Sequence, residues 1–380
     1  MRLRVFAVKK IRKLFVQKSY RALVPSCALK SHTKARLNGK LVCRILFPFT
    51  FAINYLQMPV LPNPSFKTPF WQFHAHLQTI VPSLLRKIDF DYRHRERLEL
   101  PDSDFVDLDW HCISTERKKL VIITHGLEGD SRRHYVVGMA KLFTQNGYDA
   151  LGWNCRSCSG EMNRLPRFYH HGDASDLRSV ITHAIDQYGY EEIILIGFSM
   201  GGSLSLRVVG EDPDAVPTQI KKVIAFSVPC DLLSSVKILS QSTNKIYSSR
   251  FLRKLGAKIK EKEKLFPGQI SSRGYEKIKH FVDFDNRYTA PLHGFKDAYD
   301  FYTRASVKPF LKNIRVPSLM VQAMNDTFLS PECFCYEEAE ANNYLFMETP
   351  EQGGHCGFQL PGSEYSWAEL RALEFAFSPL

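Results

Sequence analysis

Short runs of apolar residues alternate with amphipathic stretches along most of the chain. Residues 193–196 are four consecutive large apolar residues, which is typical of a strand buried on both faces. Residues 92–98 and 105–113 instead alternate apolar and polar positions around Pro101-Asp102-Ser103, which predicts an antiparallel hairpin. The full set of predicted strands is 92–98, 105–113, 120–124, 148–153, 192–197, 220–227, 316–323 and 344–348.

Amphipathic segments separate most of these predicted strands. Because strands and helices alternate, the pattern favours an α/β protein with a mostly parallel sheet and helices on both faces. Residues 231–310 interrupt the alternation. They are rich in Lys and Arg and helical in character, and we interpret them as a cap over the strand ends. The predicted helices are 76–86, 133–146, 173–188, 203–209 and 366–377.

The basic character of the chain is concentrated at its N-terminus. The 380 residues carry a formal net charge of +12, with 51 Lys and Arg against 39 Asp and Glu. Residues 1–57 contain 13 of the basic residues and no acidic one, so residues 58–380 are close to neutral. The high net charge is therefore no indication of nucleic-acid binding, and no nucleic-acid-binding motif is present. We expect no nucleic-acid partner.

Residues 1–57 need an interpretation of their own. Their apolar patch at 45–55 is interrupted by Pro48 and Asn54 and is too short to predict a transmembrane helix. The segment can be a signal anchor, an acid-poor targeting peptide, or sequence upstream of a true start at Met58. We expect it to be a disordered or non-native extension, with the folded domain at residues 58–380. We expect the protein to be cytoplasmic. The alternative is that residues 1–57 associate it with a membrane.

The cysteines do not form a disulfide or metal pattern. Nine of them are scattered along the chain, which suggests reduced thiols in a cytoplasm-like compartment. Cys155 and Cys158 form one C-x-x-C pair, but no second pair follows at zinc spacing. His170 and His171 precede Asp173, which we predict to be a helix N-cap. We therefore expect neither a metal nor another cofactor.

The clearest chemical motif lies where the strand 192–197 meets the next helix. Gly197-Phe198-Ser199-Met200-Gly201 matches the G-x-S-x-G pattern, in which a sharp strand-to-helix turn exposes a serine hydroxyl. Glycines are needed there because the helix passes close to the strand. A glycine-rich turn with a capping serine can have the same pattern, so the interpretation of the motif depends on the neighbouring sequence. The buried strand before it favours a nucleophile, Ser199.

A serine nucleophile needs a base, and the base needs a carboxylate. Asp326 follows the predicted strand 316–323, and His355 follows the strand 344–348 in a flexible Gly-Gly loop. The order Ser199, Asp326, His355 is the order of α/β-hydrolase triads. Asn325-Asp326 is also an ordinary turn pair, and His355 is one of 13 histidines. Asp231 is a rival acid, and Glu348 is a weaker one.

The transition state of acyl transfer also needs amide donors for its oxyanion. In this layout one donor is the amide after the nucleophile, that of Met200. The other is expected after the strand 120–124, where Gly126 lets the backbone turn and Leu127 can present its N–H. The sequence thus predicts an oxyanion hole formed by Leu127 and Met200.

Several stretches together resemble the YheT-like α/β-hydrolases, relatives of the α/β-hydrolase-domain membrane esterases. They are HLQTIVPSLLRK (76–87), HGLEGDSRRHY (125–135), NCRSCSGEMNRLPRFYHHGDASDL (154–177), GFSMGGSLSL (197–206), NDTFLSPE (325–332) and GGHCGF (353–358).

The resemblance implies an α/β-hydrolase fold and a serine hydrolase of short-chain esters, monoacylglycerols or related lipids. Carried over, Ser199 is the nucleophile, Asp326 the acid and His355 the base. Ser203 departs from the asparagine expected after the double glycine, which bears on substrate preference. An acyltransferase using the same triad, or an inactive membrane-tethered binding protein, are the alternatives.

Overall fold

The computed structural model describes residues 35–37, 40–42, 59–64, 66–113 and 118–380. The chain divides into two compact units, Met1–Ala52 and Ile53–Leu380. In the first unit, β1 (Ala35–Leu37) pairs with β2 (Lys40–Val42) in antiparallel orientation. The interpretation of residues 1–57 as an extension otherwise lies outside the described residues, and it stays a prediction.

The second unit is built on an eight-stranded sheet with the order β10-β9-β8-β7-β5-β6-β4-β3. Neighbouring strands are parallel except that β4 pairs antiparallel with both β6 and β3. The mostly parallel sheet and the hairpin at its edge were both predicted and are confirmed. The strands are β3 (His94–Glu99), β4 (Phe105–His111), β5 (Lys119–Thr124), β6 (Asp149–Asn154), β7 (Glu192–Phe198), β8 (Ile220–Phe226), β9 (Ser318–Val321) and β10 (Leu345–Glu348).

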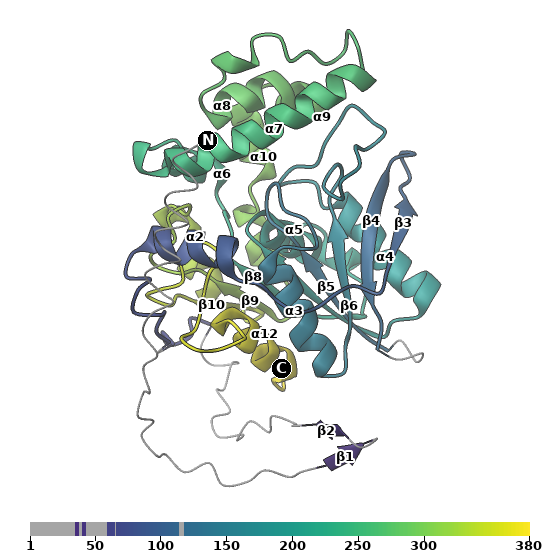
Figure 1. Cartoon of the computed structure of the whole chain (residues 1–380), viewed down its shortest axis with the longest axis vertical. Coiled ribbons are helices and arrows are strands. Elements are labelled where there is room, and N and C mark those ends of the chain that lie inside the picture. The colour runs from purple at the N-terminus through teal and green to yellow at the C-terminus, as the bar shows by residue number, and fades with distance from the viewer. Residues whose placement is uncertain (1–34, 38–39, 43–58, 65, 114–117) are drawn as a thin grey trace. The chain divides into compact units, whose positions relative to one another are not determined.

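Helices cover both faces of this sheet (Figure 1). Alternate residues of β5 show why: Leu120 and Ile122 pack with α4 (Ser175–Tyr188) and α5 (Met200–Gly210), and Val121 and Ile123 pack on the opposite face. All four side chains are fully buried. That opposite face is covered by α3 (His134–Gln145) and α12 (Trp367–Phe377), while α11 (Tyr336–Glu340) lies beside β10.

The interval that we interpret as a cap contains helices of its own, which lie above the sheet in Figure 1. They have a separate apolar core, in which Leu252 and Ile259 of the long helix pack against Phe281 and Phe284. The helices are α6 (Leu232–Leu239), α7 (Lys245–Leu265), α8 (Phe281–Phe284), α9 (Ala290–His293) and α10 (Ala298–Ala305).

The helix α2 (Ala75–Leu85) precedes the sheet in the chain, and its buried residues include Gln78 and Thr79. Across the described ranges, no helix is both long enough and apolar enough to span a bilayer.

Candidate active site

Ser199 lies on a strained turn between β7 and α5. Its backbone has φ 54° and ψ −120°, a conformation that residues with a Cβ rarely adopt. The turn is held by the Ser199 amide, which donates to the Phe226 carbonyl at 2.8 Å. The side chain is half-buried and borders a hollow, which is where a nucleophile has to be.

Two glycines allow this turn to pack so closely. A Cβ on Gly201 would lie 2.3 Å from the carbonyl oxygen of Thr124, and one on Gly197 would lie 2.2 Å from the carbonyl oxygen of Gly201. No side chain fits at such distances, so the first turn of α5 approaches β5 and β7 only because both positions are glycine. This is the steric reason that the sequence motif implies.

Asp326 and His355 are brought together from the ends of two neighbouring strands. Asp326 follows β9 and His355 follows β10, and His355 Nδ1 lies 2.9 Å from Oδ2 and 3.1 Å from Oδ1 of Asp326. The carboxylate is fully buried, and the ring of Phe328 stacks on the imidazole at a centroid distance of 4.0 Å. With Nδ1 bonded to Asp326, Nε2 is the nitrogen left for a serine hydroxyl.

The electrostatics of this pair favour the protonated imidazole. Burial by itself lowers the pKa of His355, but the Asp326 carboxylate and Cys356 outweigh it, so the pKa lies above its ordinary value. A base held in this way stabilises the imidazolium that forms when it accepts a proton.

The loop that carries His355 is anchored by α2. Gln78 Oε1 accepts hydrogen bonds from the Gly353 amide and from Asn325 Nδ2, both at 2.9 Å. Thr79 Oγ1 accepts from the His355 amide at 2.9 Å. Sequence reasoning missed these positioning residues. The signal that could have found them is two adjacent polar residues within a largely apolar helical stretch.

We expect Gln78→Leu to lower both stability and turnover. The substitution leaves the Gly353 amide and the Asn325 side-chain amide without their acceptor, at about 1–3 kcal/mol for each buried donor. Because these groups position the loops of His355 and Asp326, kcat should fall about tenfold or more below the melting transition. Thermal unfolding and ester hydrolysis measure the two effects. Leu84→Gln on the exposed part of the same helix is the control, and equal kcat values in both variants would contradict the positioning role.

The loop after β5 and the start of α5 present the two amides expected to form an oxyanion hole. Among the described residues, the amides of Leu127 and Met200 donate no hydrogen bond to another group of the protein. The neighbouring Gly126 amide is occupied, because it donates to the Tyr135 hydroxyl at 3.2 Å. His125 is buried and structural, since the Cys155 amide donates to its Nε2 at 3.1 Å. Burial lowers the pKa of His125 to about 4, so it is neutral.

Glu128, directly after Leu127, joins this loop to the cap. Its side chain accepts a hydrogen bond from the Tyr169 hydroxyl at 2.7 Å and forms an ion pair with Lys258 of α7 at 2.8 Å. Its carbonyl oxygen accepts a further bond from Lys254 of the same helix at 2.8 Å. Glu128 has φ 54°, so the loop is strained at the residue that these contacts hold.

A hollow opens from Ser199 and His355 under the cap. Its walls are mainly apolar and come from the cap helices and from the loop of residues 155–173, which contributes Phe168 and Tyr169. Apolar side chains of the cap that line it include Val236, Leu239, Phe251, Leu255, Phe281 and Phe284. Such a mainly apolar cavity, bordered by Ser199 and His355, fits an apolar chain attached to a reacting group.

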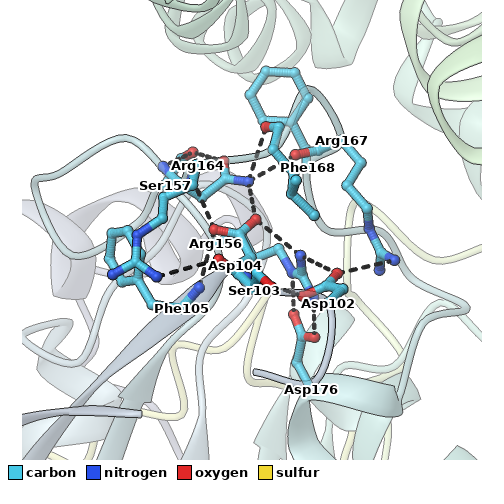
Figure 2. A network of polar contacts seen from close by, with 12 residues as sticks. Asp102, Ser103, Asp104, Phe105, Arg156, Ser157, Arg164, Arg167, Phe168 and Asp176 are labelled. Atoms are coloured by element: carbon cyan, nitrogen blue, oxygen red, sulfur yellow. Dashed lines mark hydrogen bonds and ion pairs between the residues drawn. The ribbon is translucent and has the colours of Figure 1, made fainter. Parts of the chain in front are cut away.

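A buried ion network fixes the loop of residues 155–173 (Figure 2). Arg156 binds both carboxylate oxygens of Asp176, at 2.7 and 2.8 Å, and also contacts Asp102 at 2.7 Å and Asp104 at 2.9 Å. Asp104 is fully buried and accepts a hydrogen bond from the Arg164 amide at 2.8 Å. The turn of the β3–β4 hairpin thus holds the loop that forms one wall of the hollow.

The rival acids lie elsewhere. Asp231 is the N-cap of α6 and accepts hydrogen bonds from the Ser234 amide at 2.8 Å and from the Ser234 hydroxyl at 2.6 Å. Glu348 forms a buried ion pair with Arg371 at 2.7 Å. Asp173 is not the N-cap that we predicted. Ala174 holds that position, and Asp173 instead pairs with Arg167 and accepts from the Ser175 amide.

The cysteines of the described residues, Cys155 and Cys158 among them, are free thiols. Within those residues, no group of three or more His, Cys, Asp or Glu side chains could hold a metal ion. Burial raises the pKa of Cys158, although Lys258 lies 3.3 Å from its sulfur.

This fold is that of a class of hydrolases. The family model described as alpha/beta hydrolase fold matches residues 119–359, so the chain belongs to the α/β-hydrolase family. An esterase of Pyrococcus furiosus, Pf2001, has a similar fold, with a TM-score of 0.50 and 18% identity over 83% of this chain and 96% of that chain.

The resemblance to the YheT-like hydrolases is also confirmed. The Escherichia coli protein YheT, named as a candidate esterase, is 29% identical over 75% of this chain and 84% of its own length. The mouse phospholipase ABHD3 is 27% identical over 79% of this chain and 74% of its own length. A monoacylglycerol lipase of Saccharomyces cerevisiae is 26% identical over 67% of this chain and 58% of its own length. The predicted enzyme class, a carboxylic ester hydrolase, is confirmed.

Proposed function

We propose that this ester hydrolase works through a Ser199–His355–Asp326 triad and an acyl-enzyme intermediate. His355 Nε2 takes the Ser199 proton as Oγ attacks the ester carbonyl, and the oxyanion is bound by the amides of Leu127 and Met200. The imidazolium then protonates the leaving alcohol. In the second half-reaction His355 takes a proton from water as the water oxygen attacks the acyl-serine. The imidazolium returns that proton to Ser199 Oγ as the acyl–oxygen bond breaks and the acid is released.

The observation that carries this proposal is the joint position of the three side chains. Asp326 orients His355 through Nδ1 at 2.9 Å, and Ser199 on its strained turn borders the same hollow as His355. Ser199 and His355 border one opening, and the buried Asp326 contacts His355 from a third strand end; nucleophilic catalysis requires such an arrangement.

The walls of the hollow support an ester with an apolar acyl chain. Val236, Leu239 and Phe251 face it from the cap, and burying a methylene there contributes about 0.8 kcal/mol. Two of the relatives are named a phospholipase and a monoacylglycerol lipase, so we propose a lipid-like ester as the substrate class.

A panel of p-nitrophenyl esters of rising acyl length tests the proposal. We expect kcat/KM to rise with chain length until the hollow is filled, because each added methylene is transferred from water to apolar walls. Mass spectrometry of the quenched enzyme should find the acyl group on the peptide that contains Ser199. Activity that does not change from acetyl to octanoyl would contradict the role of the hollow.

The same panel separates the alternatives. With a second alcohol present, an acyltransferase would give mainly the new ester, whereas a hydrolase gives mainly the free acid. An inactive binding protein would release no p-nitrophenol and form no acyl-serine. Product analysis in water with added glycerol therefore decides among the three functions.

A further inference from the structure

A second hollow meets the site at Ser199 and His355, and its walls carry positive charge. It is lined by Arg133, at the start of α3, and by Arg250 and Lys254 on successive turns of α7. Both hollows share Ser199 and His355, but only the second is lined by these three cations.

Within the described residues, Arg133 is the only one of these three cations that has an ion pair with a carboxylate. Arg250 has no ion pair or hydrogen bond to any other residue that the structure describes. Lys254 donates to a backbone oxygen, the carbonyl of Glu128, at 2.8 Å. Glu128 also lines this hollow, but its carboxylate is already bound by Lys258. Arg133 likewise donates to the Glu128 carbonyl, at 2.8 Å, and its one carboxylate neighbour, Asp130, is partly exposed and lies 3.9 Å away.

The neighbouring positive charges repel one another, and this repulsion lowers their pKa values. Burial lowers the pKa of Arg250, and the charges of Arg133 and Arg253 lower it further. Burial and then Arg133 likewise lower the pKa of Lys254. An anion placed among these groups would remove the repulsion and accept charge-assisted hydrogen bonds, for which the arginine fork is well shaped.

The two hollows suit the two parts of an ester whose carbonyl is at Ser199. We propose that the cation-lined hollow binds an anionic group, of the kind a phosphate presents, on the alcohol part of the substrate. This inference rests on the proposed function, because it places the acyl chain in the apolar hollow. The substrate class becomes an acyl ester of a phosphate-bearing alcohol.

Two matched substrates test this inference with the full chain. A 1-acylglycerol and a 1-acylglycerol 3-phosphate with the same acyl group differ only in the phosphate. We expect the wild-type kcat/KM to favour the phosphate ester about tenfold or more, and Arg250→Gln to reduce that preference roughly tenfold, the size expected for one charge-assisted hydrogen bond. Arg253→Gln is the matched control, since Arg253 is on the same helix but does not line the hollow. It should keep most of the preference.

The remaining results overturn the inference in distinguishable ways. Competitive inhibition by inorganic phosphate without any preference between the two esters would assign a free-phosphate site, not a headgroup site. Equal kcat/KM values with no inhibition would remove the anion site and leave the proposed function intact. If neither these esters nor p-nitrophenyl esters are cleaved, the proposed function fails and the inference fails with it. An equal loss of preference in Arg250→Gln and Arg253→Gln would show that the preference comes from the general positive potential of α7 and not from a specific anion site.

Discussion

Ser199→Ala should abolish ester hydrolysis, with kcat lower by at least about 10⁴-fold, while the protein stays folded. Loss of a serine nucleophile removes the covalent route, and only binding and oxyanion stabilisation remain. The fold should survive because alanine, like serine, has a single unbranched Cβ in the φ 54° turn. Hydrolysis, labelling by a fluorophosphonate and thermal unfolding measure the three expectations.

Ser203→Ala is the matched control for this experiment. Ser203 lies one turn further along α5, and its buried hydroxyl has no hydrogen-bond partner among the described residues. Its removal should therefore leave labelling and turnover near the wild-type values. Labelling that persists in Ser199→Ala, or that maps to another serine, would show that the nucleophile lies elsewhere.

Asp326→Asn should lower kcat by about 10⁴-fold with little change in the melting temperature. Asparagine fills the same space, and its oxygen can still accept the hydrogen bond that the Phe328 amide gives to Oδ1 at 2.9 Å. It cannot supply the charge that orients and stabilises the His355 imidazolium. Steady-state kinetics and thermal unfolding of the purified variant measure the effect.

The pH dependence gives a second readout for Asp326→Asn. The carboxylate raises the pKa of His355, so its loss should lower that pKa. His355 acts as a base only when unprotonated, and the acidic limb of the kcat/KM profile should therefore move to lower pH. Asp231→Asn is the control, because Asp231 caps α6 and does not contact His355. A larger loss in Asp231→Asn than in Asp326→Asn would reverse our assignment of the acid.

The strands and main helices could be predicted because their patterns are local. Strands that are buried on both faces appear in the sequence as continuous apolar runs, which are easy to recognise. The strand β7, for example, begins at residue 192 as expected. The cap was visible only as a helical interval. Its shorter elements, such as α8 with four residues, are too short for a periodicity to define their ends.

The sequence likewise predicts one part of the candidate site and not the other. Ser199, Asp326 and His355 could be picked out because the carboxyl ends of parallel strands meet at one edge. The contacts that hold the site join residues far apart in the sequence, as Gln78 and Gly353 are 275 positions apart. No local pattern encodes such a pair. Arg156 likewise reads as an ordinary loop residue until the fold places Asp104 and Asp176 beside it.

The contacts of Glu128 have a consequence for how such a protein could be re-engineered. Caps of this kind look exchangeable, because they are inserted between two strands of an otherwise complete sheet. Here α7 supplies Lys254 and Lys258 to the residue that follows Leu127. A transplanted cap without Lys258 would leave the Glu128 carboxylate without its ion-pair partner at a buried position, next to the amide expected to bind the oxyanion. The cap of this hydrolase is therefore not a modular part, and grafting should succeed only when loop and helix are exchanged together.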